Sequence, residues 1–157
     1  MSGFLRLPWP VSANRYWRSF VPRGMSRAIV VLSDEAKIYK AEVGWIAKSQ
    51  GMREPLPGRV HLVCRLFPAM PKDAEKRMRK LGEGWDDNVR SLDLDNALKV
   101  TIDALKGIAY VDDAQVWRLS AERMEPDGEA RIEVSVRPIA VQQSPQTSLP
   151  ITEEVSV

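Results

Sequence analysis

The stretch from residue 93 to residue 113 constrains the fold of this chain most strongly, because it combines a short amphipathic helix with two acidic segments. Apolar residues recur there at helical spacing, at Leu94, Leu98, Ile102 and Leu105. This periodicity predicts a helix over residues 93–106 with one buried face. Gly107 follows, and a glycine just past the last turn commonly ends a helix. The helix must therefore pack on another element, with acids at its start and an acidic turn after its end.

Four acidic residues and one lysine in this stretch are candidates for a site. Asp93 fits the N-cap of the helix, and Asp95 lies in its first turn, where the helix dipole favours negative charge. Lys99 follows Asp95 by four residues and lies on the same face. Asp112 and Asp113 are predicted to form a turn. If this turn folds back beside the helix start, the four carboxylates converge and can hold a divalent metal suited to phosphodiester hydrolysis.

Each of these features also has an ordinary structural explanation. An Asp at a helix start is usually a cap, and an Asp-Asp pair in a turn is usually solvated. An Asp–Lys pair four residues apart is usually a weak surface ion pair. A cap does not require a second acid, a lysine and a further acidic turn, however, so the combination favours a functional site.

The rest of the chain predicts an α+β fold, a small mixed β-sheet packed by two main α-helices. Strands are predicted over residues 4–7, 28–32, 59–67, 115–124 and 129–137. The last two are predicted to pair as a hairpin around Pro126-Asp127-Gly128. Helices are predicted over residues 33–49 and, within a long polar segment, over residues 73–81. The domain is expected to span residues 1–138, and the polar residues 139–157 are predicted to form a disordered tail.

Composition excludes several classes of protein. The 157 residues suit one domain, and they include a single cysteine and a single histidine. Alternation along strand 59–67 places Cys64 in the core and His61 on the surface, with no role for either. Zinc sites and histidine-based triads are therefore disfavoured. Neither a membrane span nor a signal peptide is predicted, so a cytoplasmic location is expected, in a bacterium or a phage-infected cell.

Two basic clusters indicate a nucleic-acid surface. The first has no acid before Asp34 and comprises Arg6, Arg15, Arg18, Arg23 and Arg27. The second comprises Lys72, Lys76, Arg77, Arg79 and Lys80. Trp9, Tyr16 and Trp17 are interleaved with the first cluster, which suits phosphates bound by cations and bases stacked on aromatic rings. The alternative is a solvated loop with a few buried aromatic side chains.

Two separated motifs resemble the RusA family of Holliday junction resolvases. One is Leu92-Asp-Leu-Asp-Asn-Ala-Leu-Lys99, followed by Asp103-Ala-Leu105 and Val111-Asp-Asp-Ala-Gln115. The other is Leu7-Pro-Trp-Pro-Val-Ser-Ala-Asn-Arg-Tyr-Trp-Arg18, which resembles the N-terminal motif of that family. The resemblance spans residues 4–138. Two departures are a longer segment over residues 72–88 and Ser91-Leu92 where a basic residue or proline is expected.

This resemblance implies roles for individual residues. Asp93, Asp95 and Asp113 fall on the acidic metal-binding and catalytic positions of the family, and Lys99 on its catalytic lysine. Asp112 is the neighbouring acid and a further candidate ligand. Contacts to DNA are expected from both basic regions, namely from Asn14, Arg15, Arg18, Lys76, Arg77, Arg79 and Lys80.

The implied activity is that of a Mg²⁺-dependent, structure-selective endodeoxyribonuclease, with Mn²⁺ as a substitute metal. It would bind branched DNA as a homodimer and resolve four-way junctions by paired symmetric strand cleavage. Three alternatives stay open: a non-catalytic DNA-binding module, a haloacid-dehalogenase-like phosphatase suggested by Leu92-Asp-Leu-Asp-Asn96, and a nuclease of broader branched-DNA specificity. The phosphatase motif should follow a buried strand, whereas polar residues precede Asp93 here.

Overall fold

The computed structural model describes residues 3–142 and has an α+β fold. The main sheet has the strand order β1-β6-β4-β5, formed by β1 (Leu5–Pro8), β6 (Arg131–Pro138), β4 (Val60–Phe67) and β5 (Val116–Arg123). A separate hairpin pairs β2 (Trp17–Phe20) with β3 (Ile29–Leu32). The helices are α1 (Ala13–Tyr16), α2 (Asp34–Ser49), α3 (Ala74–Leu81) and α4 (Leu94–Ala104), with a short 3-10 helix, η1 (Asp113–Gln115). The predicted fold class is confirmed.

Strand β4 lies inside the sheet, between β6 and β5. Its alternate residues Val60, Leu62, Cys64 and Leu66 are all buried. It pairs in parallel with β5, with Leu62 opposite Leu119, and antiparallel with β6, with Leu62 opposite Val136. The predicted hairpin of the last two strands is therefore wrong, because β4 lies between them. The turn at residues 124–130 crosses the end of β4 instead, where the Met124 N–H donates to Leu66 O at 2.8 Å.

The connection from β4 to β5 determines where α4 lies. Parallel neighbours cannot be joined by a tight turn, so the chain must cross over the sheet. Beside the start of α4, Arg123 at the end of β5 donates to Val89 O at 2.7 Å. Beside its end, the Tyr110 hydroxyl donates to Ile102 O at 2.7 Å, just before β5 begins. The helix therefore runs opposite to the strands that it covers.

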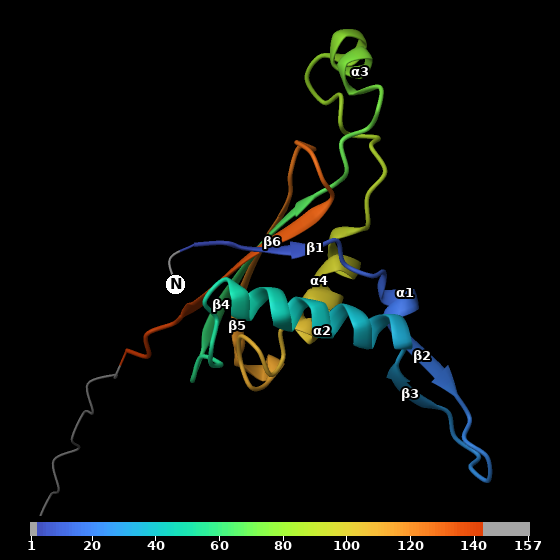
Figure 1. Ribbon diagram of the computed structural model, residues 1–157, viewed down its shortest axis with the longest axis vertical. Coiled ribbons are helices and arrows are strands. Elements are labelled where there is room, and N and C mark those ends of the chain that lie inside the picture. Colours follow the sequence, from blue (N-terminus) through green and yellow to red (C-terminus); the bar gives the residue numbers. More distant parts are fainter. Residues whose placement is uncertain (1–2, 143–157) are drawn as a thin grey trace, which may run out of the picture.

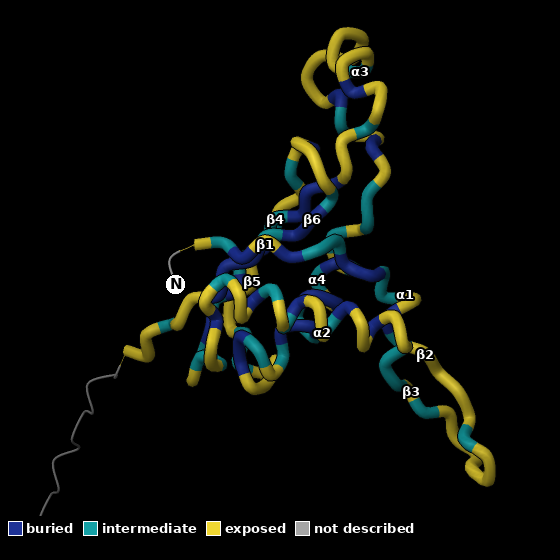
Figure 2. Tube along the Cα trace, viewed as in Figure 1, coloured by how far each residue is buried: buried dark blue, intermediate teal, exposed yellow. Residues whose placement is uncertain are grey.

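One hydrophobic core unites the sheet with α2 and α4. It contains Leu62 and Val134 from the sheet, Val43 from α2 and Val100 from α4, all with 0 % exposure. Figure 2 shows this buried centre and the exposed periphery around it. The helix predicted over residues 33–49 is confirmed as α2, and the side chain of Ser33 caps it by accepting from the Ala36 N–H at 3.1 Å. In the same core, burial raises the pKa of the Cys64 thiol to about 12.

Two segments project from this core in different directions (Figure 1). One is the β2–β3 hairpin. The strand predicted over residues 28–32 is confirmed as β3, but the sequence patterns missed β2, because its last three residues are exposed and show no buried alternation. The other carries α3, which confirms the short helix predicted over residues 73–81. It has a small cluster of its own, formed by Ala74, Trp85 and Val89. Trp85 also donates to Glu125 at 2.7 Å, which fastens this projection to the turn before β6.

The last strand, β6, ends at Pro138, and the predicted domain boundary there stays a prediction. Val60 pairs with Pro138 at the end of β6, and the Ile139 N–H donates to Arg59 O at 2.8 Å. Most of the predicted tail, residues 143–157, lies outside the described residues, and its disorder stays a prediction. Within residues 3–142, no helix is long and apolar enough to span a membrane.

Replacing Trp85 by alanine is expected to open the α3 projection without unfolding the core. The change removes the centre of a cluster that is separate from the main core, at a local cost of about 3–5 kcal/mol. Hydrogen exchange should become faster in α3 and stay slow in β4. Trp45→Ala is a matched control, because Trp45 on α2 is 72 % exposed. Unchanged exchange in α3, or equal loss of protection in β4, would contradict this account.

Candidate functional site

The start of α4 presents two acidic side chains to solvent. Asp93 is the N-cap, as predicted, but its carboxylate makes no capping hydrogen bond. Asp95 follows in the first turn, and the Lys99 ammonium lies 3.9 Å from its Oδ2 atom. The side chains of Asp95 and Lys99 are 72 % and 63 % exposed, so this ion pair is weak. The oxygens of both carboxylates are therefore open to a ligand from solvent.

The second acidic segment is a rigid turn in which the two aspartates differ. Asp112 caps η1, because its Oδ1 atom accepts from the Ala114 N–H at 2.8 Å. This bond, together with the neighbouring Asp113 side chain, holds the pKa of Asp112 below its usual range. Lys106 lies 3.8 Å from the same carboxylate. Asp112 therefore shapes the turn, whereas Asp113 forms no cap or salt bridge within residues 3–142.

Gln115 fixes the turn to a neighbouring loop. Its Oε1 atom accepts from the N–H groups of Val111 and Asp112, at 2.8 and 3.1 Å. Its amide nitrogen donates to Leu56 O at 2.9 Å and to Gly58 O at 2.8 Å. All four bonds use one side chain, so the last residue of the Val111–Gln115 motif has a structural role.

The structure does not bring the two acidic segments together. The turn lies at the C-terminal end of α4, beside Lys106, and a helix of 11 residues spans about 16 Å. In residues 3–142, no group of three acidic, histidine or cysteine side chains is arranged to hold a metal. The expectation that the turn folds back beside the helix start is therefore wrong for a single chain. The reason is the parallel β4–β5 pairing, which carries the chain to the far end of α4 before β5 begins.

The N-terminal motif is attached to the same helix. The Tyr16 hydroxyl donates to Asp103 Oδ2 at 2.5 Å, and the Lys40 ammonium donates to Asp103 O at 3.3 Å. Tyr16 is completely buried, and burial, followed by the hydrogen bond to Asp103, raises the pKa of its hydroxyl far above the usual range. Asp103 lies eight residues after Asp95 on the helix. It therefore joins two motifs that are distant in the sequence, and the sequence assigned it no such contact.

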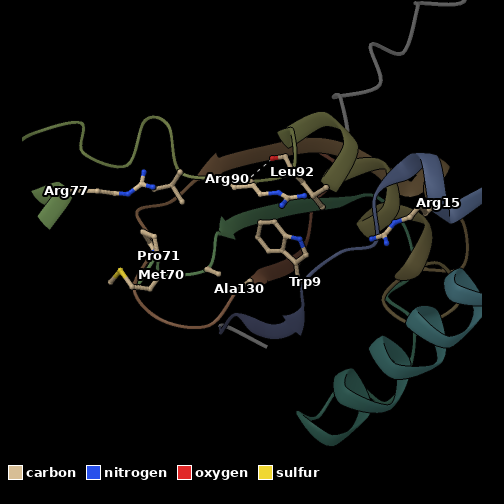
Figure 3. A pocket seen from close by; sticks show the side chains of 11 residues that line it. Trp9, Arg15, Met70, Pro71, Arg77, Arg90, Leu92 and Ala130 are labelled. Carbon is tan, nitrogen blue, oxygen red and sulfur yellow. Dashed lines mark hydrogen bonds between the residues drawn. The ribbon is translucent and has the colours of Figure 1, made fainter. Parts of the chain in front are cut away.

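A groove adjoins the start of α4, with a volume of about 570 Å³ (Figure 3). Ser91 and Leu92, which directly precede Asp93, form part of its wall. Two of the predicted DNA contacts, Arg15 and Arg77, also line it. Arg90 and Trp9 also line the groove. The sequence did not predict Arg90 as a DNA contact, and it did not distinguish Trp9 from the other aromatic residues of the N-terminal motif. Four more predicted DNA contacts are exposed on projecting elements, namely Arg18 on β2 and Lys76, Arg79 and Lys80 on α3; Asn14 is exposed on α1.

The fold and these motifs define the class of protein. The family model described as endodeoxyribonuclease RusA matches residues 8–137. The chain is 30% identical over 135 residues to the crossover junction endodeoxyribonuclease rusA of Enterobacteria phage 82, covering 84% of this chain and 91% of the relative. It is also 30% identical over 125 residues to the uncharacterized protein YqaN of Bacillus subtilis (strain 168), covering 76% of this chain and 87% of the relative.

The chain therefore belongs to the RusA family of endodeoxyribonucleases, and the resemblance of its two motifs is confirmed. The phosphatase alternative has no structural support, because residues 90–93 before α4 are irregular and form no buried strand. The roles of Asp93, Asp95, Lys99 and Asp113 stay predictions, and what they can do follows from their geometry.

Proposed function

We propose that this protein is a Mg²⁺-dependent endodeoxyribonuclease that resolves four-way DNA junctions by paired cleavage as a homodimer. One observation carries the proposal: in a RusA-family fold, two open carboxylates at the start of α4 adjoin a groove lined by arginines. The acids suit a metal and the arginines suit phosphates, so a DNA strand in the groove would have its backbone next to the acids.

The donors at the start of α4 fit Mg²⁺. This ion is usually held by one or two carboxylates, with water and substrate phosphate oxygens completing its octahedron. Asp93 and Asp95 supply two carboxylates that no cap or close hydrogen bond occupies. Mn²⁺ prefers the same oxygen donors, so it should substitute. When bound, the metal supplies a water of lowered pKa and neutralises charge on the phosphate.

Other groups of the chain would position and stabilise the phosphate. The free N–H groups at the start of α4 point toward the same region and favour an anion there. Lys99 keeps its ammonium 3.9 Å from Asp95, too far for a hydrogen bond, so it can turn to a phosphate oxygen. We assign Lys99 to that contact, and Asp93 and Asp95 would hold the ion, which would supply the attacking water.

The position of Asp113 favours a second copy of the chain. Within residues 3–142 no strand pairs with the outer edge of β5, and Trp117 and Leu119 are exposed on that strand. Two copies paired antiparallel at this edge would have antiparallel α4 helices across the two-fold axis. The start of one α4 would then lie on the side of the other copy's acidic turn, which brings a third acid toward each pair. A two-fold dimer also matches a junction that must be cut twice.

Asp95→Asn is expected to abolish cleavage of a labelled four-way junction in Mg²⁺ while leaving junction binding within about threefold. The amide keeps the shape of the side chain and removes a charged ligand, whereas phosphate contacts supply most of the affinity. Wild-type protein should convert one junction into two nicked duplexes and leave linear duplex uncut.

The matched control is Asp34→Asn. Asp34 also lies in the first turn of a helix, and Lys37 lies 4.0 Å from it. Asp34→Asn should cleave normally. Normal cleavage by Asp95→Asn would contradict the assignment of this ligand, and binding without cleavage by the wild-type protein in Mg²⁺ would select the non-catalytic alternative. Equal cleavage of flaps and junctions would select a broader nuclease.

The exposed cations of α3 are expected to contribute to DNA affinity and not to chemistry. Replacing Lys76, Arg79 and Lys80 by alanine should weaken junction binding and lower the slope of log affinity against log salt by about two to three, since each phosphate contact contributes about 0.9. Cleavage at saturating protein should stay normal. Arg77 is left unchanged, because it holds Asp73 at 2.9 Å and Asn88 at 3.2 Å.

A control of equal charge replaces three exposed cations on another side of the chain, namely Lys37, Lys48 and Arg53. Its salt slope should equal that of the wild-type protein. Equal slopes for the α3 variant and this control would show that α3 makes no phosphate contact.

A further inference from the structure

We propose that the groove beside α4 binds one unpaired nucleotide of branched DNA, with its base against Trp9 and its phosphates on the arginines. The inference deepens the proposed function and rests on it for the source of that nucleotide. Binding of an unpaired base would make the start of α4 selective for branch points, because duplex DNA offers no free base there.

The size and shape of the groove suit one nucleotide. Its volume of about 570 Å³ lies within the range of about 300–1,000 Å³ typical of small-ligand sites. Its apolar wall is formed by Trp9, Met70, Pro71 and Leu92. In Figure 3 the Trp9 ring lies in the middle of the groove, between Arg77 at one end and Arg15 at the other. A base can therefore lie against an aromatic ring while the backbone on either side meets a guanidinium.

The charge of the groove selects an anionic ligand. Three arginines line it, and none of its lining residues is acidic. Arg77 is engaged by Asp73, and Arg15 lies 3.6 Å from Glu35. Arg90, in contrast, is exposed and forms no salt bridge within the part of the chain that the structure describes. Arg90 is therefore the guanidinium most available to a phosphate.

The polar groups of the groove indicate stacking without selection of a particular base. The only lining hydroxyl, that of Ser91, donates to the adjacent Leu92 O at 3.0 Å. No lining side chain offers a carboxylate or amide to a base edge. Stacking on an aromatic ring tolerates every base, since each has a π-face. The groove should therefore recognise an unpaired state of the strand and not a sequence.

The free energy needed to bring a base into the groove is lower at a branch point than inside a duplex. A base inside a duplex must be unstacked and unpaired before it can enter, whereas a base that is already unpaired pays little. Ser91 and Leu92 join the groove directly to Asp93. A base held there would place the adjoining phosphate at the acidic pair, so recognition and cleavage would be coupled along one strand.

The test uses a short single-stranded oligothymidine with one central 2-aminopurine, in EDTA so that no cleavage occurs. The wild-type protein is expected to bind it and to quench 2-aminopurine fluorescence, as stacking on an indole ring does. Arg90→Ala should weaken binding about tenfold, and Arg53→Ala, which removes an exposed arginine elsewhere, should not. Trp9→Leu should remove most of the quenching, whereas Trp9→Phe should retain part of it.

Trp9 packs partly against the core, so circular dichroism must first show that its variants are folded. Because Arg90 is exposed, its variant tests the proposal even where a Trp9 variant fails to fold. Equal binding by Arg90→Ala and the wild-type protein, no quenching, or equal competition by polyglutamate would overturn the proposal. Binding in EDTA by a protein that never cuts junctions in Mg²⁺ would overturn the proposed function and leave this inference standing. Cleavage of junctions in Mg²⁺ without quenching of 2-aminopurine would support the proposed function and overturn this inference.

Discussion

The parallel pairing of β4 with β5 is the constraint on which the arrangement of the functional residues depends. Parallel neighbours need a crossover, and here the crossover is α4, which packs its apolar face onto the sheet. The start of α4 then lies beyond the end of β4, and its far end lies before the start of β5. Every acidic residue of interest is located by this connection, with Asp93 and Asp95 at one end of the helix and Asp113 at the other.

The N-terminal motif completes the surroundings of α4 from a distant part of the chain. Tyr16 reaches Asp103 in the last turns of the helix, and Trp9 and Arg15 reach the groove at its first turn. The motif therefore follows the helix along its length. This explains in physical terms why two blocks so far apart in the sequence occur together. One block supplies acids, and the other supplies a cation and an aromatic ring, which the proposed binding of a DNA strand beside those acids would use.

The sequence predicted local features well because they depend on local forces. The period of Leu94, Leu98 and Ile102 and the N-cap position of Asp93 are properties of one helix, and both are found. The helix ends at Ala104, two residues before the predicted end, and Gly107 follows with a positive φ. Pairing of strands depends instead on which partner buries the most apolar surface. Nothing near Pro126 reveals that β4 separates β5 from β6, so the predicted hairpin is wrong.

The site shows the same division between local and long-range information. The motifs predicted roles for Asp93, Asp95 and Lys99, and these roles stay predictions, whereas the distance between the acidic segments follows from the topology of the sheet. The groove was also beyond prediction, because Trp9, Arg77 and Arg90 belong to three separate segments. The sequence supplied the candidate residues, and the fold added their distribution over the two ends of α4.

The position of the divalent metal proposed at the start of α4 can be mapped directly. Fe²⁺ can replace Mg²⁺, and ascorbate with peroxide then produces hydroxyl radicals that cut the backbone beside the bound ion. Mass spectrometry of the fragments locates the cuts. Our account predicts cuts concentrated around Asp93 and Asp95 that disappear with excess Mg²⁺. Cuts confined to other acidic segments, such as Asp86-Asp87 on the α3 projection, or no localised cuts at all, would contradict it.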